Sequence, residues 1–166
     1  MKNGIGTMET SPLLTGRELR LAAVPPEGED RPGERRVGDG LAVANVKVLI
    51  VEDEFFIALD HQFQIEELGH TVVGIAVSAE QAVTLAERER PDVVLMDIRL
   101  TGLRDGIEAA AEIRDRYDIP SIFLTANTDP ATLRRAEQTK PIGILQKPLE
   151  RARLRAMLAR ASGAGN

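Results

Sequence analysis

Five short apolar runs recur along the chain from Val46 onward, and they limit the possible folds more than any other feature. Each run is dominated by valine, isoleucine and leucine and is too short for an ordinary helix. Each therefore predicts a strand that is buried in a sheet. The runs are residues 46–51, 71–77, 93–97, 121–126 and 143–146.

The segments between these runs have the spacing of helices. In the first segment, Ile57, Ile65 and Leu68 share one helical face. The second segment opens with Ser78 and Gln81, which stand at the spacing of a capping box. The predicted helices are residues 54–69, 78–90, 106–117, 130–139 and 149–161.

This regular alternation predicts an α/β fold in which all five strands are parallel and five helices cover both faces of the sheet. Right-handed crossovers leave few topologies, and a doubly wound five-stranded sheet is the simplest of them. In such sheets functional residues collect beyond the carboxyl ends of the strands, where the strand order reverses. The strand ends are therefore where chemistry is expected.

Four of the five predicted strands end in residues that carry a charge or a hydroxyl group. These residues are the acidic run Glu52-Asp53-Glu54, followed along the chain by Asp97, Thr125 and Lys147. Clustered carboxylates repel one another and are costly to bury unpaired, and a hard divalent cation relieves both problems. Oxygen ligands with room for water suit Mg²⁺, so the sequence predicts a magnesium site at this edge.

Asp97 is an unusual carboxylate because it directly follows the four apolar residues of "VVLM". A metal ion, the Lys147 ammonium and the Thr125 hydroxyl around one carboxylate would form a cradle for a phosphoryl group. Cations neutralise the oxygens of the transferring group, and positioning accounts for most of the catalysis. We therefore predict that Asp97 is a nucleophile that forms an aspartyl phosphate.

Four motifs at successive strand ends resemble those of response regulator receiver domains in bacterial two-component signalling. "VLIVEDE" is similar to the acidic pair of that family, "LMDIRL" to its phospho-acceptor, "FLTAN" to its switch threonine and "LQKPL" to its lysine followed by proline. The resemblance covers residues 46 to about 161. It implies a flavodoxin-like sheet with the strand order 2-1-3-4-5.

The resemblance also implies a role for each site residue. Asp97 would accept a phosphoryl group from the phosphohistidine of a histidine kinase or phosphotransfer protein. Lys147 would pair with that group, and Thr125 would swing in to bond it. The implied ligands of Mg²⁺ are Glu52 (through water), Asp53, Asp97 and the backbone carbonyl of Arg99.

The same resemblance implies a phospho-acceptor switch, not an enzyme that acts on a separate substrate. No output domain is recognisable after Ala161, so the expectation is a stand-alone receiver that binds an unidentified downstream protein. The expected oligomeric state is a monomer, or a weak homodimer formed through the last two helices and the fifth strand.

Composition excludes several function classes. The net charge of −5 leaves no basic footprint for nucleic acid or an anionic membrane. The absence of cysteine excludes disulfides and zinc thiolate sites. No apolar run approaches the roughly 20 residues that span a bilayer. We expect a cytoplasmic protein.

Residues 1–45 differ in composition from the rest of the chain. They hold 7 of the 14 glycines and 4 of the 9 prolines, and "PPEGEDRPGERRVGDG" has almost nothing to bury. Such a segment cannot offset the entropy lost on ordering, so it predicts a disordered N-terminal tail. The receiver domain is expected at residues 46–162, and residues 163–166 would form a short C-terminal tail.

Two features depart from the family's usual pattern. Ile144 stands three residues before Lys147, where the family usually has an aromatic side chain. The loop after Asp97 is one residue longer than the commonest pattern, and Thr101 stands where proline is frequent. Isoleucine is short and restricted at its first torsion, so we expect Ile144 to be fixed packing. Thr125 and the loop before the fourth predicted helix would then carry the response.

Two other function classes stay open at this point. Mg²⁺-dependent phosphohydrolases with an aspartate nucleophile have a D-x-D pattern whose second aspartate is a general acid. Here that position is Arg99, which cannot exchange a proton near neutral pH. The other class is a receiver-shaped adaptor that is never phosphorylated, although the set of acids, threonine and lysine is complete.

The two histidines have simpler interpretations than a phospho-acceptor. His61 lies between Ile57 and Ile65 on the first predicted helix, and no motif surrounds it, so it is expected to be a half-buried packing residue. His70 only precedes the second strand.

Overall fold

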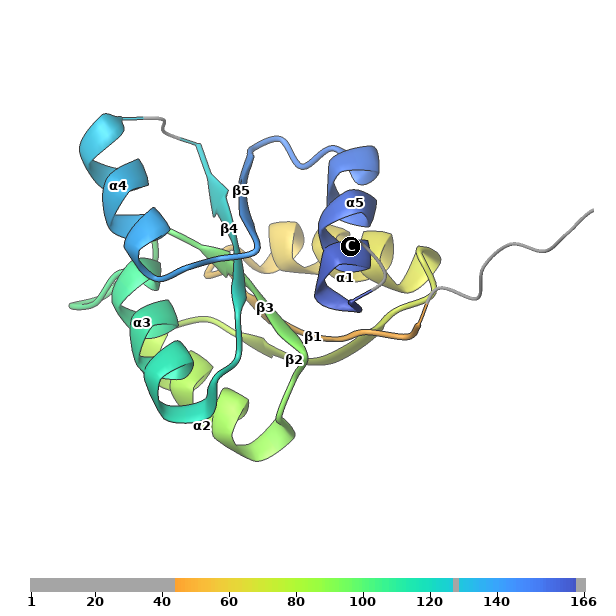
Figure 1. Ribbon diagram of the computed structural model, residues 1–166, viewed down its shortest axis with the longest axis horizontal. Coiled ribbons are helices and arrows are strands. Elements are labelled where there is room, and N and C mark those ends of the chain that lie inside the picture. The colour runs from red at the N-terminus through yellow and green to blue at the C-terminus, as the bar shows by residue number, and fades with distance from the viewer. Residues whose placement is uncertain (1–43, 127–128, 164–166) are drawn as a thin grey trace, which may run out of the picture. The chain divides into compact units, whose positions relative to one another are not determined.

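Five parallel strands form one sheet in the order β2-β1-β3-β4-β5, and five helices connect and cover them (Figure 1). The structure is a computed structural model that describes residues 44–126 and 129–163. Its elements are β1 (Lys47–Val51), α1 (Phe55–Glu67), β2 (Thr71–Ala76), α2 (Ala79–Glu89), β3 (Val93–Asp97), α3 (Gly106–Tyr117), β4 (Ser121–Thr125), α4 (Pro130–Gln138), β5 (Gly143–Gln146) and α5 (Arg151–Ala161). The predicted fold class and strand order are confirmed.

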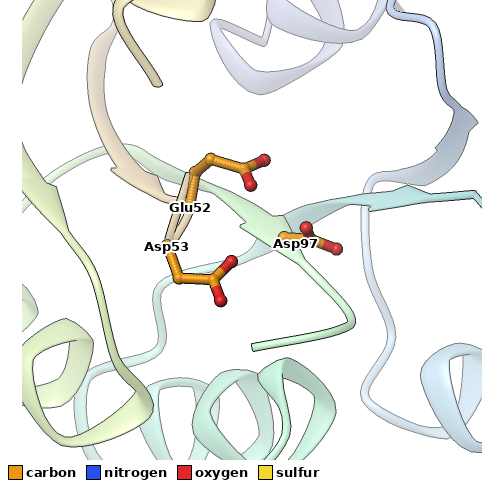
Figure 2. A group of neighbouring side chains, drawn as sticks. All are labelled: Glu52, Asp53 and Asp97. Carbon is orange, nitrogen blue, oxygen red and sulfur yellow. The ribbon is translucent and has the colours of Figure 1, made fainter. Parts of the chain in front are cut away.

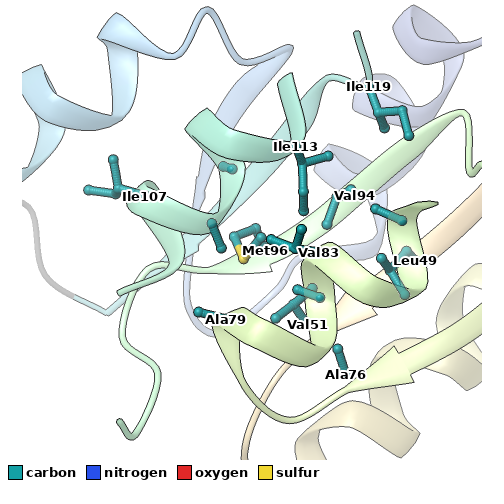
Figure 3. Close-up of a cluster of buried hydrophobic side chains, with 14 of the residues drawn as sticks. Leu49, Val51, Ala76, Ala79, Val83, Val94, Met96, Ile107, Ile113 and Ile119 are labelled. Atoms are coloured by element: carbon teal, nitrogen blue, oxygen red, sulfur yellow. The ribbon is translucent and has the colours of Figure 1, made fainter. Parts of the chain in front are cut away.

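Both faces of the sheet are buried because side chains alternate between them along each strand. In β1, Val48 and Ile50 belong to a core cluster shared with α1 and α5. Leu49 and Val51 belong to the cluster on the opposite face, beneath α2 and α3 (Figure 3). α4 joins this second cluster through Ala136.

Side-chain caps are found where three of the described helices begin, namely α2, α3 and α4. Ser78 accepts a hydrogen bond from the amide of Gln81 at 3.2 Å, as the predicted capping box requires. The Gln81 side chain, however, accepts from the amide of Val77 instead of closing the box on Ser78. A complete capping box is found at α3, where Asp105 and Glu108 each accept from the other's backbone amide.

α3 starts in direct contact with the end of β3. The amide of Gly106 donates to the carbonyl of Ile98 at 3.0 Å, and a Cβ atom on Gly106 would overlap the carbonyl oxygen of Asp97. Only a residue without a side chain allows this approach. Gly106 therefore sets the position of α3 relative to the candidate phospho-acceptor.

The predicted N-terminal tail lies outside the described residues except for Ala44 and Asn45, and residues 164–166 of the predicted C-terminal tail also lie outside them. The domain limits of 46 and 162 stay a prediction. Within the described residues, no helix is long and apolar enough to cross a bilayer.

Replacing Gly106 tests the contact between α3 and β3. The added Cβ meets backbone atoms, which no side-chain rotation can move, so Gly106→Ala should lower the free energy of unfolding by roughly 2–4 kcal/mol. Gly74→Ala in β2 is the matched control, because its Cβ would meet the Leu49 and Leu85 side chains at an ordinary 3.5 Å. Its effect should stay below about 1 kcal/mol. Urea unfolding followed by circular dichroism measures the free energy of unfolding of both variants. Equal losses would show that the close contact between α3 and β3 does not require glycine at position 106.

Candidate functional site

The carboxylates of Glu52, Asp53 and Asp97 lie together at the carboxyl ends of β1 and β3 (Figure 2). One oxygen atom from each side chain lies within 4.8 Å of the others. β2 lies on one side of β1, and β3 lies on the other. The order of the strands in the sheet therefore reverses between β1 and β3, where this site lies. The structure thus brings Asp97 to the adjacent acids Glu52 and Asp53, which are far from it in the sequence.

Lys147 bridges two of these acids from the end of β5. Its Nζ donates to Glu52 Oε2 at 2.8 Å and to Asp97 Oδ2 at 2.7 Å. The side chains of Glu52, Asp97 and Lys147 are 1%, 8% and 19% exposed, so both ion pairs are largely shielded from water. Such pairs are strongly coupled, because removing one partner leaves an uncompensated buried charge.

The environment shifts the pKa values of Glu52 and Lys147. Burial raises the pKa of Glu52, and the nearby charge of Asp97 adds to that effect, while Lys147 opposes it. Burial would lower the pKa of Lys147, but its hydrogen bonds to Asp97 and Glu52 prevail and raise the pKa above its ordinary value. Lys147 is therefore a permanent cation at neutral pH.

Backbone amides from the loop after β3 hold the other carboxylate oxygens. The amide of Arg99 donates to Asp97 Oδ1 at 2.9 Å, and the amide of Thr101 donates to Asp53 Oδ2 at 3.0 Å. A proline at position 101 could not make the second bond, since it has no N–H group. The departure at Thr101 therefore gives Asp53 a hydrogen-bond donor. The role of the Arg99 carbonyl as a metal ligand stays a prediction.

Thr125 is the last residue of β4 and is 4% exposed. It pairs in register with Gln146, and its carbonyl accepts a hydrogen bond from the amide of Lys147 at 2.9 Å. β4 lies beside β3, so Thr125 stands at the same sheet edge as Asp97. This placement suits a residue that contacts a group on Asp97, and the switching role of its hydroxyl stays a prediction.

The donor chemistry of the site fits a hard divalent cation. Three carboxylates each offer one oxygen atom, and two of their side chains are buried. The single ammonium of Lys147 cannot neutralise all three, and Mg²⁺ prefers oxygen ligands of this kind. Glu52, Asp53 and Asp97 are therefore the residues that could hold such an ion.

His61 lies beside this site and is buried more deeply than the sequence indicates, with 3% exposure. It lines a groove between α1 and the start of the segment after β5, together with Phe56, Lys147 and Leu149. Within the described part of the chain, its Nδ1 has no hydrogen-bond partner. Burial lowers the pKa of His61, and the charge of Lys147 lowers it further, so the imidazole is neutral at physiological pH.

His70 also has a structural role that its position in the sequence does not reveal. It is 5% exposed, and its Nδ1 accepts a hydrogen bond from the amide of Val46 at 3.2 Å. This bond joins the start of β1 to the start of β2. Burial lowers the pKa of His70, so the imidazole is available as a neutral acceptor.

The site combines clustered acids, a bridging lysine and a threonine at the edge of a doubly wound parallel sheet where the strand order reverses. This combination defines a class of signalling domain. Residues 48–159 match the family model described as "Response regulator receiver domain". The chain belongs to this family of two-component signalling proteins.

Named relatives and a solved structure agree with this assignment. The chain is 34% identical over 116 residues to the phyllosphere-induced regulator PhyR of Methylorubrum extorquens, covering 69% of this chain and 43% of PhyR. It is 38% identical over 110 residues to the transcriptional regulatory protein PdtaR of Mycobacterium tuberculosis, covering 66% of this chain and 53% of PdtaR. The chain thus spans about half the length of these curated relatives.

The solved structure is the receiver domain of the sensor histidine kinase PA1611 from Pseudomonas aeruginosa PAO1. It superposes with a TM-score of 0.64 at 36% identity, covering 72% of this chain and 99% of that domain. That domain has a magnesium ion coordinated in its active site cleft.

Removing the bridging ammonium should make stability depend on pH. In Lys147→Ala the pKa of Glu52, already raised by burial, would rise further, so the folded state would bind this proton more tightly than the unfolded chain. Stability is then lost as pH rises above the ordinary pKa of a glutamate side chain, and it is regained on acidification. At neutral pH we expect a loss of roughly 2–4 kcal/mol, measured by urea unfolding.

Arg151→Ala is the matched control for this experiment. It removes an ion pair with Glu67 at 2.6 Å whose side chains are 47% and 40% exposed. Water screens such a pair, so the loss should be below about 1 kcal/mol and nearly independent of pH. A small, pH-independent loss for Lys147→Ala as well would show that the bridge is not electrostatically important.

Proposed function

We propose that this protein is a phospho-acceptor switch in which Asp97 is the phosphorylated residue. The observation that carries the proposal is the pairing of the Asp97 carboxylate with Lys147 at 2.7 Å, within reach of the acids Glu52 and Asp53. A carboxylate next to a fixed cation, at the end of a strand and beside a cluster of metal-binding oxygens, has the surroundings that phosphoryl transfer requires.

The proposed reaction is a transfer from phosphohistidine on a histidine kinase or phosphotransfer protein. An oxygen of the Asp97 carboxylate attacks phosphorus, the new O–P bond forms, and the P–N bond to the imidazole breaks. The electron pair of that bond stays on the imidazole nitrogen. Lys147 stabilises the negative oxygens of the phosphoryl group as it moves, because its ammonium already lies against Asp97.

Magnesium is the cofactor that we propose for this site. Asp53, Asp97 and the Arg99 carbonyl would hold the ion, and Glu52 would contribute through water. A bound Mg²⁺ would neutralise charge on the transferring group. The donor set described above and the magnesium ion reported for the PA1611 receiver domain support this assignment.

Thr125 is the residue through which we propose that phosphorylation is sensed. It stands at the end of the strand next to Asp97, and a bond from its hydroxyl to the phosphoryl group would favour one conformation over another. Ile144 is half-buried and packs against the core beneath α2 and α3. We therefore assign Ile144 to fixed packing. The readout would be a changed surface for a downstream protein in the cytoplasm.

Phosphorylation with acetyl phosphate and Mg²⁺ tests the assignment of Asp97. The wild-type chain should gain the mass of one phosphoryl group, measured by intact-protein mass spectrometry. Asp97→Asn should gain none, because the amide is not an anionic nucleophile. Asp115→Asn, which changes an exposed aspartate on α3, is the control and should still be phosphorylated. A phosphoryl group retained on Asp97→Asn would refute the proposal, and a wild type that gains none would favour the unphosphorylated adaptor.

Magnesium titration tests the metal ligands separately from phosphorylation. Asp53→Ala should weaken Mg²⁺ binding by about tenfold or more, because it removes one of the clustered carboxylates. Asp60→Ala, which changes an exposed acid on α1, should leave the affinity within about twofold. Isothermal titration calorimetry gives both values. Equal affinities in the wild type and Asp53→Ala would exclude Asp53 as a ligand.

A further inference from the structure

Asp53 is held differently from the two acids beside it. Glu52 and Asp97 share the ammonium group of Lys147, while the side chains of Glu52 and Asp53 leave the end of β1 in different directions (Figure 2). In the part of the chain that the structure describes, Asp53 has no ion pair, and its hydrogen-bond donor is the backbone amide of Thr101, 3.0 Å from Oδ2. A neutral group therefore orients this carboxylate.

The amide of Thr101 is held in place by the loop that carries it. Before it, Leu100 is partly buried and packs against the core cluster beneath α2 and α3. After it, Arg104 binds Glu112 of α3 at 2.7 Å, and Asp105 forms the capping box of the same helix. The donor is thus supported on both sides before any ligand arrives, as a preorganised site requires.

The side chain of Thr101 is not needed for this contact. It is exposed, and the hydrogen bond comes from the main chain. Any residue except proline can supply the same N–H group. The departure from the proline that is frequent in the family therefore matters to Asp53, whereas the choice of threonine does not.

The hydrogen bond also limits how Asp53 can bind a metal ion. Each acid of the cluster offers one oxygen atom within 4.8 Å of the others. An ion that bound both oxygen atoms of Asp53 would have to share Oδ2 with the N–H group of Thr101. Ca²⁺ takes about 6–8 oxygen ligands and accepts both oxygens of one carboxylate, whereas Mg²⁺ is smaller and requires nearly octahedral geometry. A carboxylate restricted to one oxygen atom therefore suits Mg²⁺ better than Ca²⁺.

We propose that the backbone amide of Thr101 is a positioning group that favours Mg²⁺ over Ca²⁺ at this site. The inference rests on the proposed function, because it takes the acid cluster as a metal site. The amide acts only through Asp53, whose carboxylate it holds in place as a one-oxygen ligand. Hydrogen-bond partners of metal-ligating carboxylates typically change metal affinity by about 10–100-fold. Thr101 thus determines specificity without contacting the ion.

Calorimetric titration of the full chain with Mg²⁺ and with Ca²⁺ tests the proposal. Thr101→Pro removes the N–H group and should weaken Mg²⁺ binding by about tenfold, while Ca²⁺ binding falls by less than about threefold. Thr101→Ala is the matched control, because it keeps the N–H group and changes only an exposed side chain. It should leave both affinities within about twofold of the wild type. Circular dichroism verifies that both variants are folded.

The ratio of the two affinities separates a lost hydrogen bond from a distorted loop. A distorted loop would also move the Arg99 carbonyl, so it would lower Mg²⁺ and Ca²⁺ binding equally. Equal losses, or an unchanged Mg²⁺ affinity in Thr101→Pro, would overturn the inference. The proposed metal site would still stand in that case if Asp53→Ala weakens Mg²⁺ binding. A wild type that binds no Mg²⁺ would overturn both.

Amide hydrogen exchange is a second measurement that needs neither a metal ion nor the proline variant. In the metal-free wild type, the Thr101 amide should exchange about tenfold or more slowly than in Asp53→Ala, because the carboxylate protects it. The amide of Leu103, a fully exposed residue of the same loop, is the control and should exchange at similar rates in both proteins. Equal exchange of the Thr101 amide in both proteins would show that the hydrogen bond does not form, and the inference would fail.

Discussion

The ammonium group of Lys147 connects three strand ends of the sheet. It binds Glu52 after β1 and Asp97 at the end of β3, which are 95 and 50 residues away in the sequence. Both carboxylates are buried, and a buried carboxylate without a cation is costly. The link from the end of β5 to the ends of β1 and β3 and the ionised state of Glu52 therefore depend on the same side chain. Structure and chemistry are coupled at this point.

Much of this arrangement could be predicted from local sequence. Apolar runs identify strands, and parallel strands place their carboxyl ends at one edge, so the sequence predicts that Asp97 and Lys147 lie near each other. The bond from the Thr101 amide to Asp53 could not be predicted, because it depends on the path of a loop that has no periodic pattern. The family resemblance drew attention to the missing proline at this position. The structure shows what threonine contributes there.

α1 illustrates a different limit of sequence analysis. Its outer face is as apolar as its inner face, so hydrophobic spacing does not identify which side meets the sheet. Ile57 and Leu68, expected in the core, are only partly buried, while Ala58 and His61 are buried. Periodicity assumes that apolar residues face inward. It fails where a helix has a second apolar side, and this failure is itself a sign of an interaction surface.

The number of charges in the site has a consequence for its chemistry. Three carboxylates and one ammonium sum to two negative charges, so a divalent ion makes the site neutral, whereas a monovalent ion leaves it negative. Converting one carboxylate into an acyl phosphate adds about one negative charge near neutral pH. The filled and modified site would then hold one charge that neither the ion nor Lys147 balances. A hydroxyl such as that of Thr125, which we propose as the sensor of phosphorylation, would be attracted to this unbalanced charge.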